Sequence, residues 1–186
     1  MAQLAIRHRY FFCLRPCTQD ANRIHAFADS LRGPWKLQSA SRLHVTAAIT
    51  EDWPVPVPAL VAALLRAGDA VQAQPFELVL DQLSASPTHL VLRPARAIPE
   101  LKELGATIRA AMAQEGVPLR EGWRFNPHMT LGFGRGRQFV RPVQPVSWSV
   151  NEFILVHSAV GATNHEVLGR WTLEPQQEAQ LSLFAA

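Results

Sequence analysis

Hydrophobic residues follow two different periods along the chain, and the changes of period divide it into strands and helices. Continuous or alternating apolar runs predict strands at 9–15, 42–50, 76–83, 88–94, 127–133, 147–160 and 165–173. Apolar residues three and four positions apart predict helices from Thr18 to the Gly33-Pro34 stop, at 58–67, and from Pro99 to about Glu115. We expect segments 51–58 and 134–142 to be connections, and the tail after Pro175 to be frayed or weakly helical.

The predicted elements repeat in the same order in the two halves of the chain. A strand, a helix and a strand with His44 come first, and a strand, a helix and a strand with His128 follow, 128 − 44 = 84 positions later. Such a repeat indicates an internal duplication within one bilobed domain that spans residues 1–186. The expected fold class is α+β, with two pseudo-symmetric lobes around a central cleft. Each lobe is expected to be an antiparallel sheet with helices on its outer side.

The composition is that of a folded protein with a mildly basic surface. Hydrophobic residues make up 48% of the 186 residues, and the formal net charge is +3. This charge favours small anionic or single-stranded partners over the coating of duplex nucleic acid. No apolar run reaches the roughly 18 residues that span a bilayer, and charges interrupt the N-terminal segment. We therefore expect no membrane contact and a cytoplasmic location, and we also expect a monomer.

The cysteines are few and close together. Cys13 and Cys17 lie four positions apart, without His or acidic residues at metal-binding spacings. We expect two reduced thiols, no metal site and no cofactor.

At two corresponding strands, a histidine is followed two positions later by a threonine. Successive strand residues point to opposite faces, so His44 shares a face with Thr46, about 7 Å away. His128 shares a face with Thr130 in the same way. Across a cleft, a neutral imidazole can accept a proton while a charged one donates a proton. Threonine hydroxyls can donate hydrogen bonds to phosphate oxygens, so the four residues suit an in-line displacement at phosphorus without a metal ion.

Each motif taken alone has a simpler interpretation. A histidine at the start of a strand is often half-exposed, and threonine is common in strands because it is β-branched. The other histidines lack the pattern. We expect His8, His25 and His89 to be structural or exposed, whereas His157 and His165 flank the last hairpin and could line the cleft.

The segments "LHVTA" and "PHMTLGF", with "RYFFCLRP" near the start and "VLGRWTL" near the end, carry a family resemblance. From about residue 9 to 173 the chain resembles the 2H phosphoesterase superfamily. Within it, the chain most resembles the bacterial and archaeal RNA 2′,3′-cyclic phosphodiesterases, also called 2′-5′ RNA ligases. The resemblance implies the bilobed LigT-like fold, metal-independent hydrolysis of 2′,3′-cyclic phosphates to 2′-phosphates, and reversible 2′-5′ RNA ligation in some members.

The resemblance also implies roles for the motif residues. His44 would be the proton donor to the leaving O3′, and His128 the proton acceptor that activates water. Thr46 and Thr130 would bind the phosphate. The partners would be RNA ends or nucleotides that bear a 2′,3′-cyclic phosphate. The alternatives are a module that binds a nucleotide or RNA end without turnover, and a 2H hydrolase of another cyclic phosphate or a 2′-5′ oligonucleotide.

The chain departs from the family pattern after the second motif. Relatives often place an arginine five residues after the second histidine, where this chain has Phe133. We expect Arg135 or Arg137 from the following loop to bind the phosphate instead, although a merely solvated arginine-rich loop is an equal alternative. Arg42 has the same strand parity as His44 and is a further candidate.

Aromatic residues could stack on a base of the substrate. Trp123 lies in a polar loop before the second motif, and we expect it to contact the ligand. Trp53, Trp148 and Trp171 are assigned to packing.

Overall fold

The computed structural model describes residues 6–162 and 164–175, so the predicted helical tail after Pro175 lies outside the described residues. The strands are β1 (Arg7–Leu14), β2 (Trp35–Leu37), β3 (Val45–Ile49), β4 (Phe76–Ala85), β5 (His89–Arg93), β6 (Met129–Gly134), β7 (Phe139–Val150), β8 (Glu152–Val160) and β9 (Asn164–Thr172). The helices are α1 (Thr18–Ser30), α2 (Pro58–Asp69) and α3 (Pro99–Gln114), and η1 (Ala40–Arg42) is a single 3₁₀ turn. None of the helices in the described ranges is long and apolar enough to cross a membrane.

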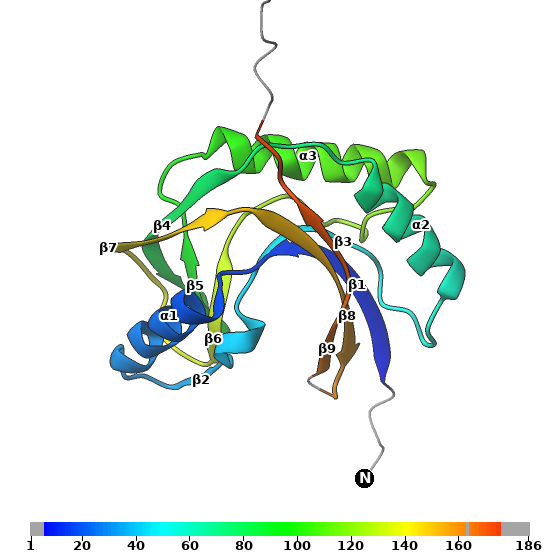
Figure 1. Cartoon of the computed structure of the whole chain (residues 1–186). Helices are drawn as coiled ribbons and strands as arrows, with labels where there is room; N and C mark the ends of the chain where they lie inside the picture. Colours follow the sequence, from blue (N-terminus) through cyan, green and yellow to red (C-terminus); the bar gives the residue numbers. More distant parts are fainter. Residues whose placement is uncertain (1–5, 163, 176–186) are drawn as a thin grey trace, which may run out of the picture.

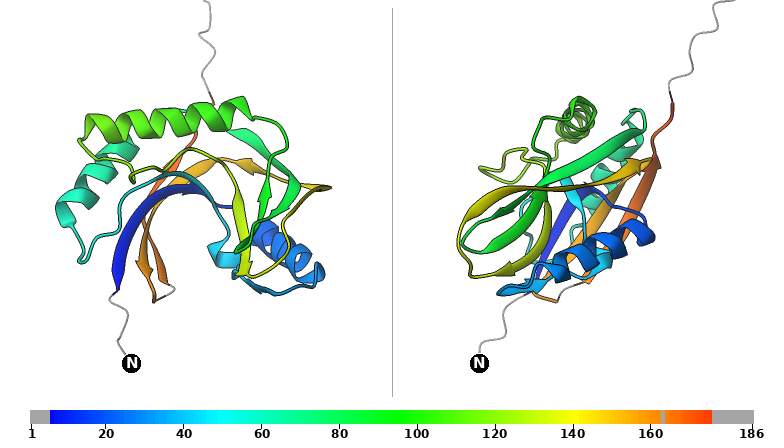
Figure 2. Two further views of the ribbon diagram at one scale, coloured as in Figure 1. Left: turned by 180° about the vertical axis from the view of Figure 1, so that it is seen from behind. Right: turned by 90° about the vertical axis from the view of Figure 1, so that its left-hand side faces the viewer.

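The strands form one antiparallel sheet in the order β7-β4-β5-β6-β3-β1-β8-β9, with β2 paired to β6. The sheet curves into an arch, and the helices lie outside it (Figures 1 and 2). A single residue pair, Val45 with Met129, joins β3 to β6 at the middle of the order. We call β3, β1, β8 and β9 the first half-sheet, and β6, β5, β4, β7 and β2 the second. The α+β class with antiparallel sheets and outer helices is confirmed.

The strand order is the same from both ends of the sheet. Counted outward from the middle of the whole sheet, each half-sheet begins with its motif strand, β3 or β6. The first strand of the same repeat follows, β1 or β5, and then a strand from the other repeat, β8 or β4. This order is what an internal duplication predicts, and the duplication itself stays a prediction.

The two motif strands carry a β-bulge at the same place. β3 has one extra residue, Ala47, directly after Thr46, and β6 has one extra residue, Leu131, directly after Thr130. A bulge puts two consecutive residues opposite one and shifts the alternation of faces by one position. As a result, the residue five positions after each histidine returns to the histidine's face.

The first part of the edge strand β7 was missed by the sequence prediction. Segment 134–142 was expected to be a connection, yet β7 begins at Phe139 and pairs with β4 along most of its length. The predicted strand 147–160 is also wrong as one strand, since β7 ends at Val150 and β8 begins at Glu152. Pro142 and Pro145 lie within β7 and lack the N–H that a central strand would need. They are tolerated because β7 has a neighbour on one side only.

The two faces of the sheet hold separate apolar clusters. Tyr10, Phe12 and Leu14 of β1 belong to the large core under the helices, as do the buried faces of α1 and α3. The alternate residues Phe11 and Cys13 belong to a smaller cluster on the opposite, concave face, with residues of β3 and β8. Trp53, Trp148 and Trp171 are part of the large core or pack against it, which confirms their assignment to packing.

Candidate active site

The two histidine motifs lie at the start of neighbouring strands in the middle of the sheet. His44 directly precedes β3 and His128 directly precedes β6, and the first residues of these strands pair with each other in antiparallel register. Continuing this register by one residue in each direction sets each histidine opposite the threonine of the other motif. Thr46 lies opposite Cys13 and so shares the concave face with the small apolar cluster. The structure therefore brings the four predicted residues together on one face.

Both imidazoles are held by the same backbone contact. The His44 Nδ1 lies 2.6 Å from the carbonyl oxygen of Arg42, and the His128 Nδ1 lies 2.7 Å from that of Asn126. A carbonyl oxygen can only accept, so Nδ1 carries the proton in both rings. This contact leaves each Nε2 as the nitrogen that can accept or donate a proton.

An arginine stands beside each histidine on the next strand, and the sequence prediction missed both. Arg15 directly follows β1, and Arg93 is the last residue of β5; these strands flank β3 and β6. The positive charge of Arg15 acts on His44, and that of Arg93 acts on His128. The signal was present in the repeat, because "YFFCLR" and "HLVLR" end on an arginine at corresponding places.

Burial and positive charge both favour neutral histidines in the free site. Burial lowers the pKa of His44 to about 4, and the charges of Arg15, His128 and Arg42 act in the same direction. Burial also lowers the pKa of His128 below its ordinary value, together with the charge of Arg93. At neutral pH both Nε2 atoms of the free site therefore have a lone pair available.

A third histidine, His165 of β9, lies beside His44 in the first half-sheet. Its ring lies edge-on to His44, with centroids 5.7 Å apart, and edge-on to Phe11 at 5.5 Å. Its Nδ1 lies 3.3 Å from a guanidinium nitrogen of Arg15, and its Nε2 lies 3.4 Å from one of Arg42. Burial and the nearby positive charges lower the pKa of His165 to about 3. The expectation that His165 could line the cleft, and the candidacy of Arg42, agree with this geometry.

His157, the other histidine of the last hairpin, lies away from the motif residues. It stacks on Tyr10, which belongs to the core under the helices, and its Nε2 lies 2.8 Å from the His8 Nδ1. The idea that His157 lines the cleft is therefore wrong. Alternation along β8 explains the difference, since the neighbouring Ser158 is the residue that pairs with His165.

Trp123 lies at the edge of the concave face. It is half-buried against the small apolar cluster that contains Phe11. Arg120 holds the loop of Trp123 against the sheet. Its guanidinium contacts Asp52, and its backbone N–H donates to the Ile49 carbonyl oxygen, 3.0 Å away. Contact between Trp123 and a ligand stays a prediction.

Phe133 occupies the place five residues after His128. Because of the bulge at Leu131, it lies opposite His89 rather than under the helices, and the two rings meet edge to face with centroids 5.1 Å apart. The Phe133 side chain is 44% exposed. An apolar ring thus stands on the histidine face at the position where the family resemblance implies an arginine.

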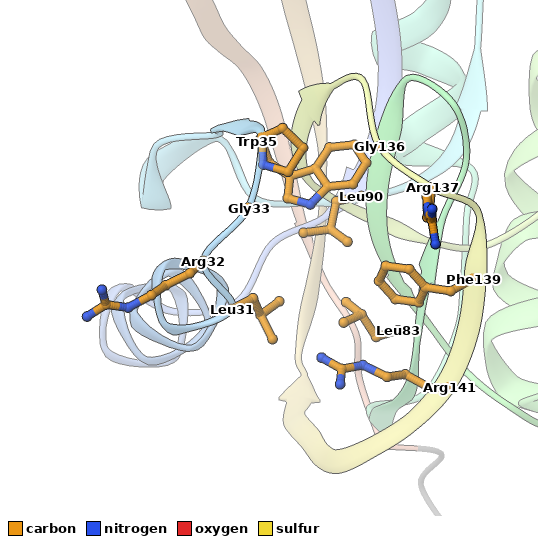
Figure 3. Close-up of a pocket in the computed structure, with 11 residues that line it drawn as sticks. Leu31, Arg32, Gly33, Trp35, Leu83, Leu90, Gly136, Arg137, Phe139 and Arg141 are labelled. Carbon is orange, nitrogen blue, oxygen red and sulfur yellow. The ribbon is translucent and has the colours of Figure 1, made fainter.

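The two loop arginines lie farther along the chain and are exposed. Arg137 lines a hollow of about 390 Å³ between the α1–β2 loop and the β6–β7 loop, where Trp35, Phe139 and Arg141 also lie (Figure 3). Neither His44 nor His128 lines this hollow. Phosphate contact by Arg135 or Arg137 stays a prediction, and Arg93 is the arginine whose charge reaches His128.

The described residues offer few other reactive groups. They include no group of three or more His, Cys, Asp and Glu side chains that could hold a metal ion. Burial raises the pKa of the Cys13 thiol to about 12, so this thiol stays protonated at neutral pH and is a poor nucleophile. The imidazoles are the groups of this site that can accept or donate a proton near neutral pH.

Comparison with known proteins finds one matching family. The family model of the 2′-5′ RNA ligase superfamily matches residues 16–162. A search of the curated proteins found no match.

Several solved structures share the fold. The crystal structure of E. coli LigT complexed with 3′-AMP is 24% identical, with a TM-score of 0.76, covering 91% of this chain and 99% of that chain. A structure described as a phosphoesterase is 22% identical, with the same TM-score and coverage. TT0787 of Thermus thermophilus is 19% identical, with a TM-score of 0.69, covering 91% of this chain and 100% of that chain. These matches confirm the predicted LigT-like fold.

Proposed function

Because the chain belongs to the 2′-5′ RNA ligase superfamily, we propose that it hydrolyses 2′,3′-cyclic phosphates of RNA ends or nucleotides to 2′-phosphates. The observation that supports this proposal is the arrangement at β3 and β6, where two imidazoles with free Nε2 atoms lie opposite two threonines. This pairing supplies an acid, a base and two hydroxyl donors around one phosphate, and the step needs no metal ion.

The reaction is an in-line displacement at phosphorus. His128 Nε2 accepts a proton from a water molecule, whose oxygen forms the new P–O bond. The P–O3′ bond breaks, and His44 Nε2 donates its proton to the leaving O3′. Hydroxyls of Thr46 and Thr130 donate hydrogen bonds to the non-bridging oxygens, whose negative charge grows in the transition state.

The proton on His44 has to be supplied when substrate binds. In the free site, burial and the charges of Arg15 and Arg42 hold His44 neutral. A phosphodiester between these groups brings a negative charge that offsets the arginines and raises the pKa of His44. Substrate binding therefore favours uptake of a proton from solvent onto the residue that must donate it.

Arginines at both sides of the site would bind the phosphate charge. Arg15 and Arg93 are the best placed, because each stands beside a motif histidine. Arg135 and Arg137 remain candidates for an outer contact with RNA. Trp123 would stack on a base at the edge of the concave face.

The same groups serve 2′-5′ ligation. If a 5′-hydroxyl of a second RNA replaces the water, His128 accepts the proton of that hydroxyl and O3′ again leaves. Reversal of these steps cleaves the 2′-5′ linkage. E. coli LigT has been solved with 3′-AMP, ATP and NADP+, which supports nucleotides as ligands of this fold. We further propose that the protein acts as a cytoplasmic monomer.

The test is product identification. The purified protein is incubated with adenosine 2′,3′-cyclic phosphate in EDTA, and the product is identified by chromatography against 2′-AMP and 3′-AMP, with the doubly substituted His44→Ala/His128→Ala protein as the control. We expect 2′-AMP from the wild type alone. A 3′-AMP product would reverse the leaving oxygen, and binding without conversion would indicate a nucleotide-binding module.

A further inference from the structure

Three arginines beside the histidines have no acidic partner among the described residues. The Nε atoms of Arg15, Arg42 and Arg93 are buried and make no hydrogen bond, and none of the three forms an ion pair with a described carboxylate. Arg9 and Arg120 are half-buried like these three arginines, and both contact Asp52. Charge that is partly removed from water is costly unless it is paired, so the three guanidiniums without a carboxylate indicate a site that binds an anion.

Two of these guanidiniums meet at a single imidazole. Arg15 and Arg42 approach the Nδ1 and Nε2 of His165 at 3.3 and 3.4 Å. A neutral imidazole has one acceptor nitrogen only, so just one of the two arginines can donate to the ring. The other guanidinium faces a ring N–H and needs an acceptor from elsewhere.

The first motif has one more arginine near its histidine than the second motif has. The residue two positions before the histidine is Arg42 in the first motif and Asn126 in the second, although both give the same backbone contact. A reacting cyclic phosphodiester carries one negative charge, whereas the three arginines carry three positive charges. One phosphate between the histidines therefore leaves the charge near Arg42 uncompensated.

A hollow of about 750 Å³ has Arg15 in its wall. The η1 residues next to Arg42 also line it, together with Thr18, Ser39 and Ser149 and with the ion-paired Glu152 and Arg170. A nucleotide chain that passes Arg15 would enter a space with hydrogen-bond donors.

We propose that Arg42 and His165, next to Arg15 at the first phosphate, form a subsite for a second phosphate, the one on the 5′ side of the nucleotide that carries the cyclic phosphate. The substrate class is then an RNA end rather than a mononucleotide with a free 5′-hydroxyl. Arg42 binds the second phosphate, and His165 is a positioning residue that keeps the two guanidiniums apart, with Arg15 at the first phosphate and Arg42 at the second. This inference rests on the proposed function, because it places the first phosphate between the histidines.

The experiment measures binding of stable product analogues, so it does not depend on turnover. Adenosine 2′-monophosphate is compared with adenosine 2′,5′-bisphosphate by calorimetry, and both are compared with the dinucleotide ApA that ends in a 2′-phosphate. We expect the second phosphate to tighten binding by about tenfold or more, because charge-assisted hydrogen bonds to arginine are strong. In Arg42→Gln this gain is lost, so the ratio of bisphosphate to monophosphate affinity falls to near one. In His165→Phe, which keeps the ring shape, the gain shrinks.

The control is Arg96→Gln, an exposed arginine of the β5–α3 loop, which should keep the full gain. Equal affinity for mono- and bisphosphate in the wild type would overturn the subsite and leave the proposed function standing. A gain that survives in Arg42→Gln would place the second phosphate elsewhere and also overturn it. Failure of all three ligands to bind, together with no hydrolysis of the cyclic substrate, would overturn both proposals. Tighter binding of the bisphosphate than of the dinucleotide would identify a small nucleotide, not RNA, as the source of the second phosphate.

Discussion

The two half-sheets hold their histidines in the same way but surround them differently. In each, the imidazole Nδ1 contacts the carbonyl two residues earlier, and a bulge follows the threonine. An arginine on the flanking strand, Arg15 or Arg93, stands beside each histidine. Around this shared frame, the first half-sheet adds Arg42 and His165, whereas the second adds His89 and Phe133. Backbone geometry is repeated, and the chemical difference comes from side chains around it.

That difference supports the proposed roles of His44 as the acid and His128 as the base. His44 is surrounded by more positive charge than His128, so its protonation depends more strongly on an anionic ligand. A group that gains its proton only when the phosphate is present is suited to be the acid. A group with a smaller perturbation is suited to be the base.

The strongest test of the comparison removes each histidine in turn. We expect His44→Ala and His128→Ala each to lower kcat for adenosine 2′,3′-cyclic phosphate by about a thousandfold, since each loses one proton-transfer step. The matched control is His25→Ala on α1, which should retain nearly full activity. If one motif histidine could be removed with little loss, the paired mechanism would be wrong.

A smaller effect is expected from the flanking arginines. Arg93→Met should lower kcat/KM by about ten- to a hundredfold, because it removes a charge beside the phosphate site. Exchange of Arg135 or Arg137 for Gln should cost less, since both are exposed. Steady-state kinetics on the cyclic substrate separates these cases, and a larger loss from the loop arginines would return the phosphate contact to that loop.

The position of Phe133 offers a way to sharpen this result. Since the bulge turns residue 133 to the histidine face, Phe133→Arg in the Arg93→Met background should recover part of kcat/KM. Phe133→Leu in the same background supplies no charge and should recover nothing. Recovery by both would mean that the ring itself, not the missing charge, limits the reaction.

The smallest predicted effect is on the titration of the free protein. As the pH falls, NMR should show protonation of His128 before His44, because His44 is more strongly perturbed. Phosphate ions should raise the pKa of His44 more than that of His128. The opposite order in the free protein would contradict the assigned asymmetry.

The same titration affects stability. The unfolded chain binds a proton on His44 near pH 6.5, whereas the folded chain does so near pH 4. The free energy of unfolding therefore falls as the pH drops through this window, by at most about 3 kcal/mol from this residue. Urea unfolding at several pH values measures this decrease, and His44→Phe should reduce it.

Local periodicity predicted most of the fold. The three helices and the strands with continuous apolar runs were found because their patterns are set by near neighbours in the sequence. The first part of β7 was missed because Pro142 and Pro145 indicate a loop unless the strand is known to lie at an edge, which is a property of the sheet. β2 is only three residues long and pairs with β6 alone, so it leaves almost no pattern.

In the candidate site too, the residues set by local patterns were predicted, and those set by strand neighbours were not. The His-x-Thr pairs follow from the two-residue repeat of a single strand, so the sequence was sufficient to predict them. Arg15 and Arg93 depend on which strands are neighbours. His165 depends on the curvature that brings β9 over to His44, and no local pattern encodes that contact.

Because of the matched bulges, residues 49 and 133 occupy equivalent places in the two half-sheets. Both are reached from a histidine by five steps along the chain, and both point to the histidine face without any change in the backbone. Here they are Ile49, which is buried, and Phe133, which is exposed. Single substitutions at these two places can therefore change which ligand the fold accepts, whereas an insertion or deletion between the histidine and the bulge of either strand would turn the proposed catalytic residues away from each other.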